Sequence, residues 1–269
     1  MALLELQQVS FIYPNGSKAL DQVSMSFEEG EKVAIIGQNG AGKTTAVKLM
    51  NGLLKPTSGT VIVDGWNTLE HTTAQVSSKV GYVFQNPDDQ IFHETIREEV
   101  EFSTRHLNLS ESEASQVVNE ALQLTGLMDV ADLHPYSLPY SLRKFVAIAA
   151  VLAMQTKVVI LDEPTAGQDA RSLERLTKII EHLTKNGKTV IMITHDMNYV
   201  ADQFDRVIAM ANRRVVSDST AKEIFWNPAV MKESHLQAPP VTQLAGTLSL
   251  GGRIITVDAF VKACKGTKE

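Results

Sequence analysis

Residues 37–45 form the glycine-rich stretch GQNGAGKTT, which fits the spacing Gly-x-x-x-x-Gly-Lys-Thr. Glycines let the backbone turn so tightly that successive N–H groups converge on the positive end of the following helix. A polyphosphate fits such a cradle. Lys43 would neutralise its outer phosphates, and the Thr44 hydroxyl would ligate Mg²⁺. The predicted phosphate-binding residues are Gly37, Asn39, Gly40, Ala41, Gly42, Lys43, Thr44 and Thr45.

A second cluster of reactive side chains follows the apolar run VVIL, where Asp162 and Glu163 stand side by side. A buried strand that ends in carboxylates places them at the carboxyl edge of a parallel sheet, where ligands bind. Asp162 is therefore predicted to hold Mg²⁺, directly or through water. Glu163 is predicted to polarise a water molecule that attacks the terminal phosphate. A strand that merely ends in solvated acids is the alternative, and the phosphate loop argues against it.

Two polar residues also end strand-like runs, Gln85 after VGYVF and His195 after TVIMIT. In a parallel sheet both would emerge beside the phosphates. Gln85 could contact Mg²⁺ or the water, and His195 could reach the terminal phosphate. Tyr13 in FIYPNG is open to two interpretations: its ring could stack on a base, or it could pack on the sheet as a turn aromatic.

The elements that must position these residues follow an α/β pattern. Strands are expected around 23–27, 32–36 and 60–63, and helices after Lys43 and over 110–127. Ser110 and Glu113 form a capping box at the start of the second helix, and Gly126 would end it. Three later strand-like runs, KVVILD, KTVIMITH and RVIAMA, alternate with helical patterns, which predicts a parallel sheet with crossover helices.

The bulk composition limits the classes of function. The 269 residues suffice for one large α/β domain with a small appendage, and the net charge of −6 gives no general attraction for nucleic acid. The longest apolar run is much shorter than a membrane span, and the start MALLELQQ does not resemble a secretory signal. One cysteine, Cys264, excludes an internal disulfide and fits a reducing compartment.

Together these motifs resemble the ATP-binding cassette (ABC) ATPases. The resemblance covers about residues 1–220 and rests on the phosphate loop, Gln85, a helix-leading segment, ILDEPTAGQD and His195. It implies an ABC-type P-loop ATPase domain over 1–220, with a mostly parallel core sheet, an antiparallel β subdomain and a helical subdomain at about 88–155. Residues 221–269 are expected to form an appendage of short helices, with a possible strand at GRIITV and a dimerising role. Such a chain binds ATP and Mg²⁺ and hydrolyses ATP.

YVFQNPDDQIF, residues 82–92, and the proline-bearing appendage are most similar to the energy-coupling factor (ECF) ATPases, which drive uptake of vitamins or metal ions. The family's helix before the carboxylate strand begins with the signature Leu-Ser-Gly-Gly-Gln. Alignment on VAIA at 146–149 places Leu138, Pro139, Tyr140, Ser141 and Leu142 in its five positions, of which only Leu138 matches the signature. The lost serine hydroxyl and glycine N–H groups would otherwise approach a nucleotide held by a second subunit.

Two alternatives remain for this segment. A shifted alignment would let Ser141 supply the hydroxyl, although no shift restores two glycines. The segment could also be a plain packing helix, but the polar pair Arg143–Lys144 suits a face that meets phosphate or a partner. Asp169 has two compatible interpretations, communication between nucleotide sites or a simple helix cap.

The resemblance implies an architecture in which each site uses one chain's phosphate loop and another chain's signature. A heterodimer with a second ABC ATPase that has an intact signature is therefore expected, because a homodimer would lack both signatures. The implied partners include a transmembrane coupling protein, docked on the segment from Gln85 to about Arg105, and a substrate-binding membrane subunit. The expected location is the cytoplasmic face of the cell membrane, with no nucleic acid bound.

Two rival functions differ from transport. ABC ATPases that act on ribosomes or DNA usually join two cassettes and carry basic inserts, neither of which is visible here. A nucleotide-dependent scaffold without hydrolysis is the other, and the intact Glu163 and His195 argue against it.

Overall fold

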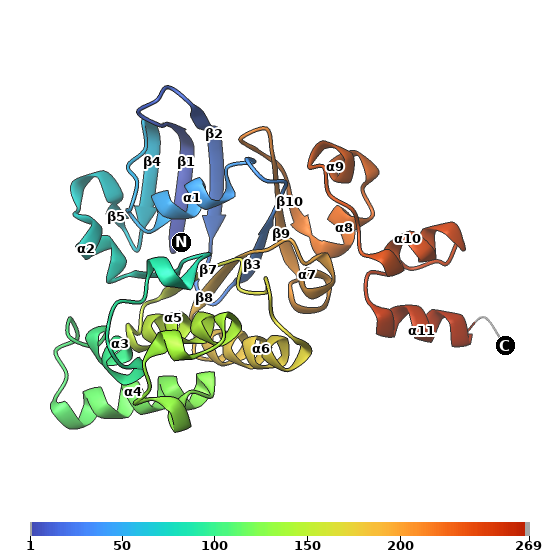
Figure 1. Cartoon of the computed structure of the whole chain (residues 1–269). Coiled ribbons are helices and arrows are strands. Elements are labelled where there is room, and N and C mark those ends of the chain that lie inside the picture. Colours follow the sequence, from blue (N-terminus) through green and yellow to red (C-terminus); the bar gives the residue numbers. More distant parts are fainter. Residues whose placement is uncertain (1, 267–269) are drawn as a thin grey trace.

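Two β-sheets and a set of helices build the chain, which a computed structural model describes over residues 2–266. One sheet has four antiparallel strands in the order β2-β1-β4-β5. The other has six strands in the order β10-β9-β3-β8-β7-β6, of which all but β10 run parallel. This mixture confirms the predicted α/β class with its antiparallel and mostly parallel sheets (Figure 1).

The strands have the following bounds: β1 (Leu4–Ile12), β2 (Lys18–Phe27), β3 (Lys32–Ile36), β4 (Ser58–Val63), β5 (Trp66–Asn67), β6 (Val80–Val83), β7 (Val158–Asp162), β8 (Thr189–Ile193), β9 (Arg206–Ala211) and β10 (Arg214–Thr220). The α-helices have these bounds: α1 (Lys43–Met50), α2 (Thr73–Ser77), α3 (Ile96–Phe102), α4 (Glu111–Thr125), α5 (Tyr140–Ala153), α6 (Ala170–Lys185), α7 (Met197–Gln203), α8 (Ala221–Phe225), α9 (Pro228–Glu233), α10 (Pro240–Thr247) and α11 (Val257–Gly266).

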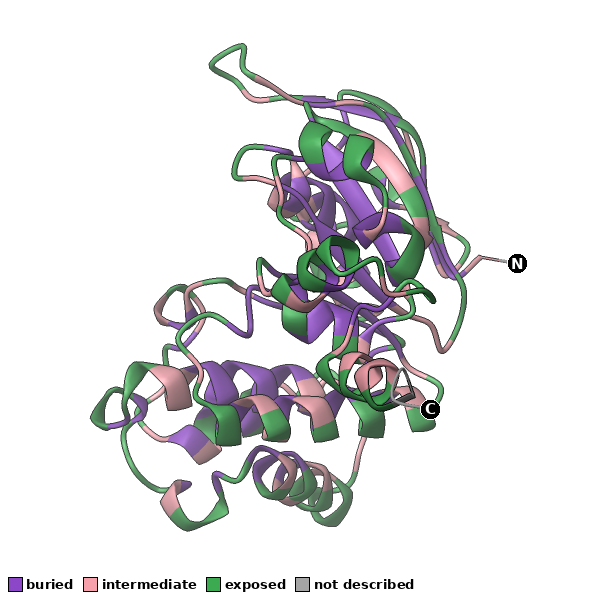
Figure 2. Cartoon of the chain, turned by 90° about the vertical axis from the view of Figure 1, so that its right-hand side faces the viewer, coloured by how far each residue is buried: buried purple, intermediate pink, exposed green. Residues whose placement is uncertain are grey.

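The six-stranded sheet lies between two apolar layers because alternate residues of its strands point to opposite faces. In β3, Val33 and Ile35 pack with α1 and the antiparallel sheet. Ala34 and Ile36 pack on the other side with helices that include α5 and α6. The strands of the body and the inner sides of the lower helices are accordingly buried (Figure 2). Burial on both faces explains why the central strands read as continuous apolar runs.

The local signals for α4 are confirmed in full. Ser110 accepts the backbone N–H of Glu113, and the Glu113 carboxylate accepts the backbone N–H of Ser110 at 2.8 Å. Gly126 ends the helix with φ of 68°, a left-handed conformation that glycine adopts without a side-chain clash. Helix α4 therefore begins and ends where its sequence predicts.

The strand expected at GRIITV is wrong. Residues 253–255 have no regular secondary structure, Arg253 has a left-handed φ of 47°, and no strand pairs with them within residues 2–266. The apolar side chains pack instead: Ile254 and Ile255 are buried, and the Trp226 indole donates to the Ile254 carbonyl at 3.0 Å. Two adjacent apolar residues thus anchor the segment without forming a sheet.

The region after residue 220 contains the short helices α8–α11, as expected, although residues 267–269 of the predicted appendage lie outside the described part. Ile224, Phe225, Val230 and Met231 join the main core. Helices α10 and α11 lie to one side of the body (Figure 1). No helix among residues 2–266 has the length and apolar character needed to cross a bilayer.

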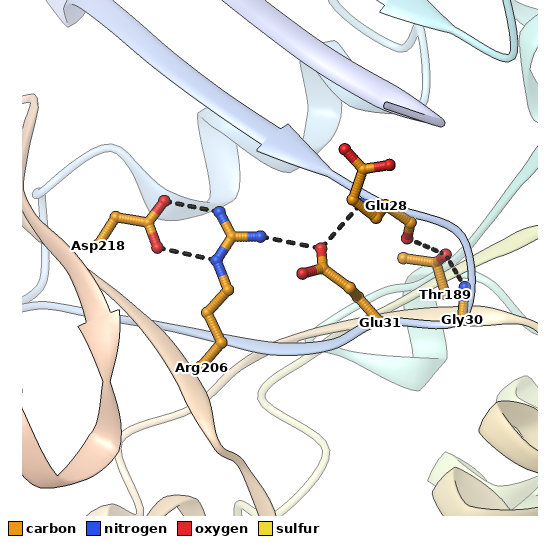
Figure 3. A network of polar contacts seen from close by, with 6 residues as sticks. All are labelled: Glu28, Gly30, Glu31, Thr189, Arg206 and Asp218. Carbon is orange, nitrogen blue, oxygen red and sulfur yellow. Dashed lines mark hydrogen bonds and ion pairs between the residues drawn. The ribbon is translucent and has the colours of Figure 1, made fainter. Parts of the chain in front are cut away.

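A polar network closes the amino edge of the six-stranded sheet (Figure 3). Gly37 and Asp162 lie at the opposite, carboxyl edge. The Arg206 guanidinium donates to both oxygens of Asp218 and to Glu31 at 2.7–2.9 Å. The Thr189 hydroxyl donates to the Glu28 carbonyl and accepts from Gly30. The network fixes the starts of β3, β8 and β9 relative to one another.

Candidate active site

A pocket of about 390 Å³ collects most of the predicted site residues at the carboxyl edge of the parallel strands. Gln85 follows β6, Glu163 follows β7, and His195 follows β8. The walls of the pocket come from separate parts of the chain: Tyr13, Ser17, Lys18, Ala19, Asn39, Gly40, Gly42, Lys43, Thr44, Thr45, Gln85, Glu163, Ile193, His195 and Arg213.

The loop between β3 and α1 needs glycine at two positions. Gly37 has φ of 153° and Gly42 has φ of 101°. A Cβ at Gly37 would lie 2.3 Å from the Met210 carbonyl oxygen, and a Cβ at Gly42 would lie 2.6 Å from the Ala19 carbonyl oxygen. Backbone on both sides leaves no room for a side chain, so the tight loop depends on these glycines.

Lys43 begins α1 and is buried, with its ammonium held inside the loop. Its Nζ donates to the Gly37 carbonyl at 2.6 Å and the Gln38 carbonyl at 3.1 Å. Burial lowers the pKa of Lys43, and the nearby Glu163 and Asp162 carboxylates partly offset this. The arrangement presents a desolvated cation to an anionic ligand in the pocket.

Asp162 is the last residue of β7, and its carboxylate supplies oxygen ligands of the kind that Mg²⁺ prefers. The Tyr82 hydroxyl donates to its Oδ2 at 2.8 Å, whereas its buried Oδ1 accepts no hydrogen bond from the described residues. Burial raises the pKa of Asp162, and the Tyr82 and Thr44 side chains counteract the rise. A buried carboxylate oxygen without a donor is costly unless a cation reaches it. Asp162 and Thr44 thus fit a magnesium ion.

Glu163 and His195 both line the pocket, and their side chains contact each other. Glu163 Oε1 lies 3.1 Å from His195 Nε2, and the backbone N–H of His195 donates to Glu163 Oε2 at 3.2 Å. Glu163 has φ of 52°, a left-handed conformation that is uncommon for a residue with a side chain. Burial raises the pKa of Glu163, and the interaction with His195 opposes the rise most strongly. This carboxylate is suited to accept a proton.

Gln85 and Tyr13 both line the pocket. Gln85 is exposed, so its amide is free to meet a ligand. The Tyr13 hydroxyl lies 3.0 Å from Thr45 Oγ1, and its ring contacts Phe11 edge-on at 4.8 Å. Tyr13 therefore packs against Phe11 of β1, as one of its two interpretations expects, and it also lines the pocket, while stacking on a base stays a prediction.

Three predicted residues of the loop and strand, Gly37, Ala41 and Asp162, are not among those that line the pocket. Ala41 is buried and its N–H donates to the Gln38 carbonyl at 3.1 Å, while the Gly37 carbonyl accepts from Lys43. Conversely, sequence reasoning missed Lys18 and Arg213. Arg213 lies in the β9–β10 turn with φ of 69°. The turn is recognisable from sequence, but its contact with the pocket arises only from the packing of β10 beside β2.

None of residues 138–142 lines this pocket. They form the start of α5, where Pro139 is the N-cap residue without a side-chain hydrogen bond and Tyr140 is 42% exposed. Asp169 is also absent from the lining. It caps α6 by accepting the Ser172 backbone N–H at 2.8 Å, which lowers the pKa of its carboxyl.

The expectation for the pair Arg143–Lys144 is only half right. Arg143 is partly exposed and pairs with Asp88 at 2.8 Å, beside the rings of Tyr136 and Tyr140. Lys144 is buried instead of facing outward, and its Nζ donates to the Glu163 carbonyl at 2.6 Å. One residue along a helix turns the side chain by about 100°, so the two neighbours meet different surroundings.

Comparison with known proteins agrees with this geometry. Residues 20–166 match the family model described as ABC transporter. The chain is 39% identical over 253 residues to the energy-coupling factor transporter ATP-binding protein EcfA of Methanoculleus marisnigri, covering 94% of this chain and 91% of that protein.

Solved structures are similar as well. CbiO1 of Clostridium perfringens, described as part of the ABC transporter complex cbiONQ, aligns with a TM-score of 0.77 and 33% identity, over 92% of this chain and 99% of that one. A dimeric ATP-binding cassette in a post-hydrolysis state with ADP and Pi aligns with a TM-score of 0.74 and 29% identity, over 81% and 98%.

Proposed function

The chain belongs to the ABC transporter family as an ATP-binding, ATP-hydrolysing subunit of the energy-coupling factor type, and from this we propose that it powers a micronutrient importer as one half of an ATPase heterodimer. The observation that carries the proposal is the contrast between the nucleotide pocket and the start of α5. The pocket around Lys43 has every predicted catalytic group, whereas residues 138–142 lack the groups that would serve a second nucleotide.

Hydrolysis is assigned to the residues that face one another in the pocket. Lys43 binds the outer phosphates, and the Glu163 carboxylate takes a proton from the attacking water. His195 lies against that carboxylate at 3.1 Å, and we assign it the contact with the terminal phosphate. Gln85 positions the water, and Tyr13 borders the space for the base. Asp162 and Thr44 would hold Mg²⁺, with Gln85 as a third candidate ligand, and the ion would neutralise charge on the phosphates.

The heterodimer follows from the start of α5. In family dimers this segment donates to the nucleotide of the opposite subunit, but Pro139 has no N–H and the exposed Tyr140 ring occupies the space left open by glycine. A partner ATPase with an intact signature would complete the site of this chain. The other site, which faces residues 138–142, would bind ATP and hydrolyse it poorly.

A transmembrane protein is expected to dock on the segment after Gln85. Phe92 is 65% exposed, and its ring packs edge-on against Phe102 at 5.2 Å, with the His93 ring beside both. Exposed aromatic rings that contact one another favour burial against a partner. This surface would place the chain at the cytoplasmic face of the membrane, beside a separate membrane subunit that binds the vitamin or other micronutrient.

The division of the chain forms part of the same proposal. Residues 1–220 make the ATPase domain, with helices α3–α5 as its helical subdomain, and residues after 220 contribute contacts within the dimer. Exposed apolar side chains on α10 and α11 support that contact, namely Leu244, Leu248, Val257 and Val261.

Affinity purification of the tagged chain from gently solubilised membranes tests the proposal. We expect a second ATPase with an intact signature and small integral membrane proteins to co-purify. Recovery of the chain alone as a homodimer, or with ribosomes, would contradict the heterodimeric transporter.

A further inference from the structure

Lys144 connects the start of α5 to the loop that carries Glu163. We infer that Lys144 is a positioning residue for ATP hydrolysis, which holds the Glu163 backbone in the conformation that aims its carboxylate at the reacting water. The inference rests on the role proposed for Glu163. Lys144 does not line the nucleotide pocket and acts through the Glu163 backbone carbonyl, which accepts a hydrogen bond from its ammonium.

The geometry of Glu163 shows why its backbone needs support. Its φ of 52° turns the peptide away from the strand conformation of β7. The side chain extends to His195 at 3.1 Å, and the carbonyl extends to Lys144 Nζ at 2.6 Å. The contact with His195 therefore fixes the Glu163 side chain, and the contact with Lys144 fixes its backbone. Left-handed conformations persist in residues with a Cβ when the surroundings fix them, and they concentrate at functional sites.

The burial of Lys144 is costly for a purely structural residue. The side chain is 3% exposed, and among the described residues its ammonium contacts a backbone carbonyl but no carboxylate. Burial lowers its pKa, although the charges of Glu163 and Asp162 counteract this. An apolar side chain of similar length would fill the same space without desolvating a charge. The donor itself is therefore the feature that distinguishes lysine from methionine here.

The same contact links Glu163 to the altered segment. Lys144 Nζ lies 5.9 Å from the centroid of the Tyr140 ring, and Gln168 donates to the Ser141 carbonyl at 3.1 Å. The first turn of α5 and the loop after β7 are thus joined at two points. Rearrangement of residues 138–142 would reach the Glu163 backbone through Lys144.

The test compares Lys144→Met, Lys144→Gln and Lys144→Arg in the full-length chain, assembled with the partners that co-purify with it. Methionine removes the donor, and arginine retains a charged donor. Lys188→Met is the matched control, because Lys188 is also partly buried and donates to a backbone carbonyl, that of Gln155, at 3.0 Å. Steady-state ATP hydrolysis gives kcat and KM separately, and a fluorescent ATP analogue gives Kd.

We expect Lys144→Met to lower kcat about 100-fold, the scale of a misplaced reacting group, with KM and Kd unchanged. Lys144→Arg should recover most of the lost kcat, while Lys188→Met remains at wild-type activity. Wild-type kcat in Lys144→Met would overturn the inference, as would equal losses in the arginine and methionine variants. If methionine prevents folding, Lys144→Leu, which also lacks a donor, replaces it in the comparison with arginine, and Lys144→Gln, which keeps a neutral N–H donor, should retain part of the kcat.

Glu163→Gln in the same preparation tests the role of Glu163 separately from the role of Lys144. Loss of hydrolysis in Glu163→Gln together with normal turnover in Lys144→Met refutes only the role of Lys144. Normal turnover in Glu163→Gln refutes the proposed role of Glu163 itself.

Discussion

Glu163 combines a strained backbone, a buried carboxylate and a histidine neighbour in one residue. Replacing it by glutamine keeps the shape and removes the proton acceptor. Glu163→Gln should lower kcat by a factor of about 10²–10⁴, the usual contribution of a general base, and should trap ATP in the closed dimer. Single-turnover hydrolysis of radiolabelled ATP measures the loss, and gel filtration with ATP detects the trapped dimer. Unchanged turnover in the assembled complex would contradict this role.

Lys43 is held by two carbonyl groups of its own loop and needs only to turn toward a phosphate. Lys43→Ala should cost about 2 kcal/mol of nucleotide binding, or roughly 30-fold in Kd, because a charge-assisted hydrogen bond is lost. Titration with a fluorescent ATP analogue measures this change. Lys178→Ala is the control, since that lysine is exposed and pairs only with Glu174. Normal affinity in Lys43→Ala would refute the phosphate-binding role.

At the scale of elements, Asp64 links the β4–β5 turn to the starts of strands β6 and β7 in the parallel sheet. Its carboxylate accepts from Lys79, just before β6, and from Lys157, just before β7. These hydrogen bonds lower the pKa of Asp64. The stabilisation is therefore complete above the unfolded-state pKa of about 3.9 and is lost as pH falls through the lower folded-state value.

Asp64→Asn should accordingly remove part of the acid dependence of folding. We expect the difference in urea midpoint between the wild-type chain and the variant to be constant near neutral pH and to shrink on acidification below about pH 4. Urea titrations across this range, followed by circular dichroism, check the direction. A midpoint difference that grew on acidification would contradict the sign of the pKa shift.

The elements also show what sequence could predict. The phosphate loop, the capped helix α4 and the central strands were predictable because each carries its own local signal, such as glycine spacing, a capping box or an apolar run buried on both faces. GRIITV is rich in the β-branched residues that strands favour, but a strand also needs a neighbour, and sequence alone does not reveal one. The inward direction of Lys144 was equally hidden, because Arg143 beside it has the same polarity but is partly exposed and pairs with Asp88.

At the scale of the whole molecule, the altered signature at residues 138–142 should determine whether one or both nucleotide sites of the dimer hydrolyse ATP. Replacing residues 139–142 through P139S, Y140G, S141G and L142Q would return hydroxyl and N–H donors to the start of α5. In the assembled complex we expect ATP turnover to rise, because the second site gains the missing groups. Steady-state hydrolysis by the repaired complex checks the prediction.

This repair needs a stability control, because two glycines in the first turn of α5 cost up to about 1 kcal/mol each relative to alanine. The Y140G and S141G pair alone supplies the same flexibility without the serine and glutamine. No gain in the full repair at matched stability would show that residues 138–142 do not limit hydrolysis.

The indole of Trp226 hydrogen bonds to the Ile254 carbonyl, and the chain contains only one other tryptophan, Trp66. Trp66 stacks on His71 near the antiparallel sheet, far along the chain from this contact. A Trp66→Phe background would therefore leave Trp226 as the single tryptophan, selectively excitable beside the five tyrosines and placed where the C-terminal segment attaches to the core. Its emission would report detachment of that segment without an added label, which gives the chain a built-in optical sensor for the ordering of its own C-terminal region.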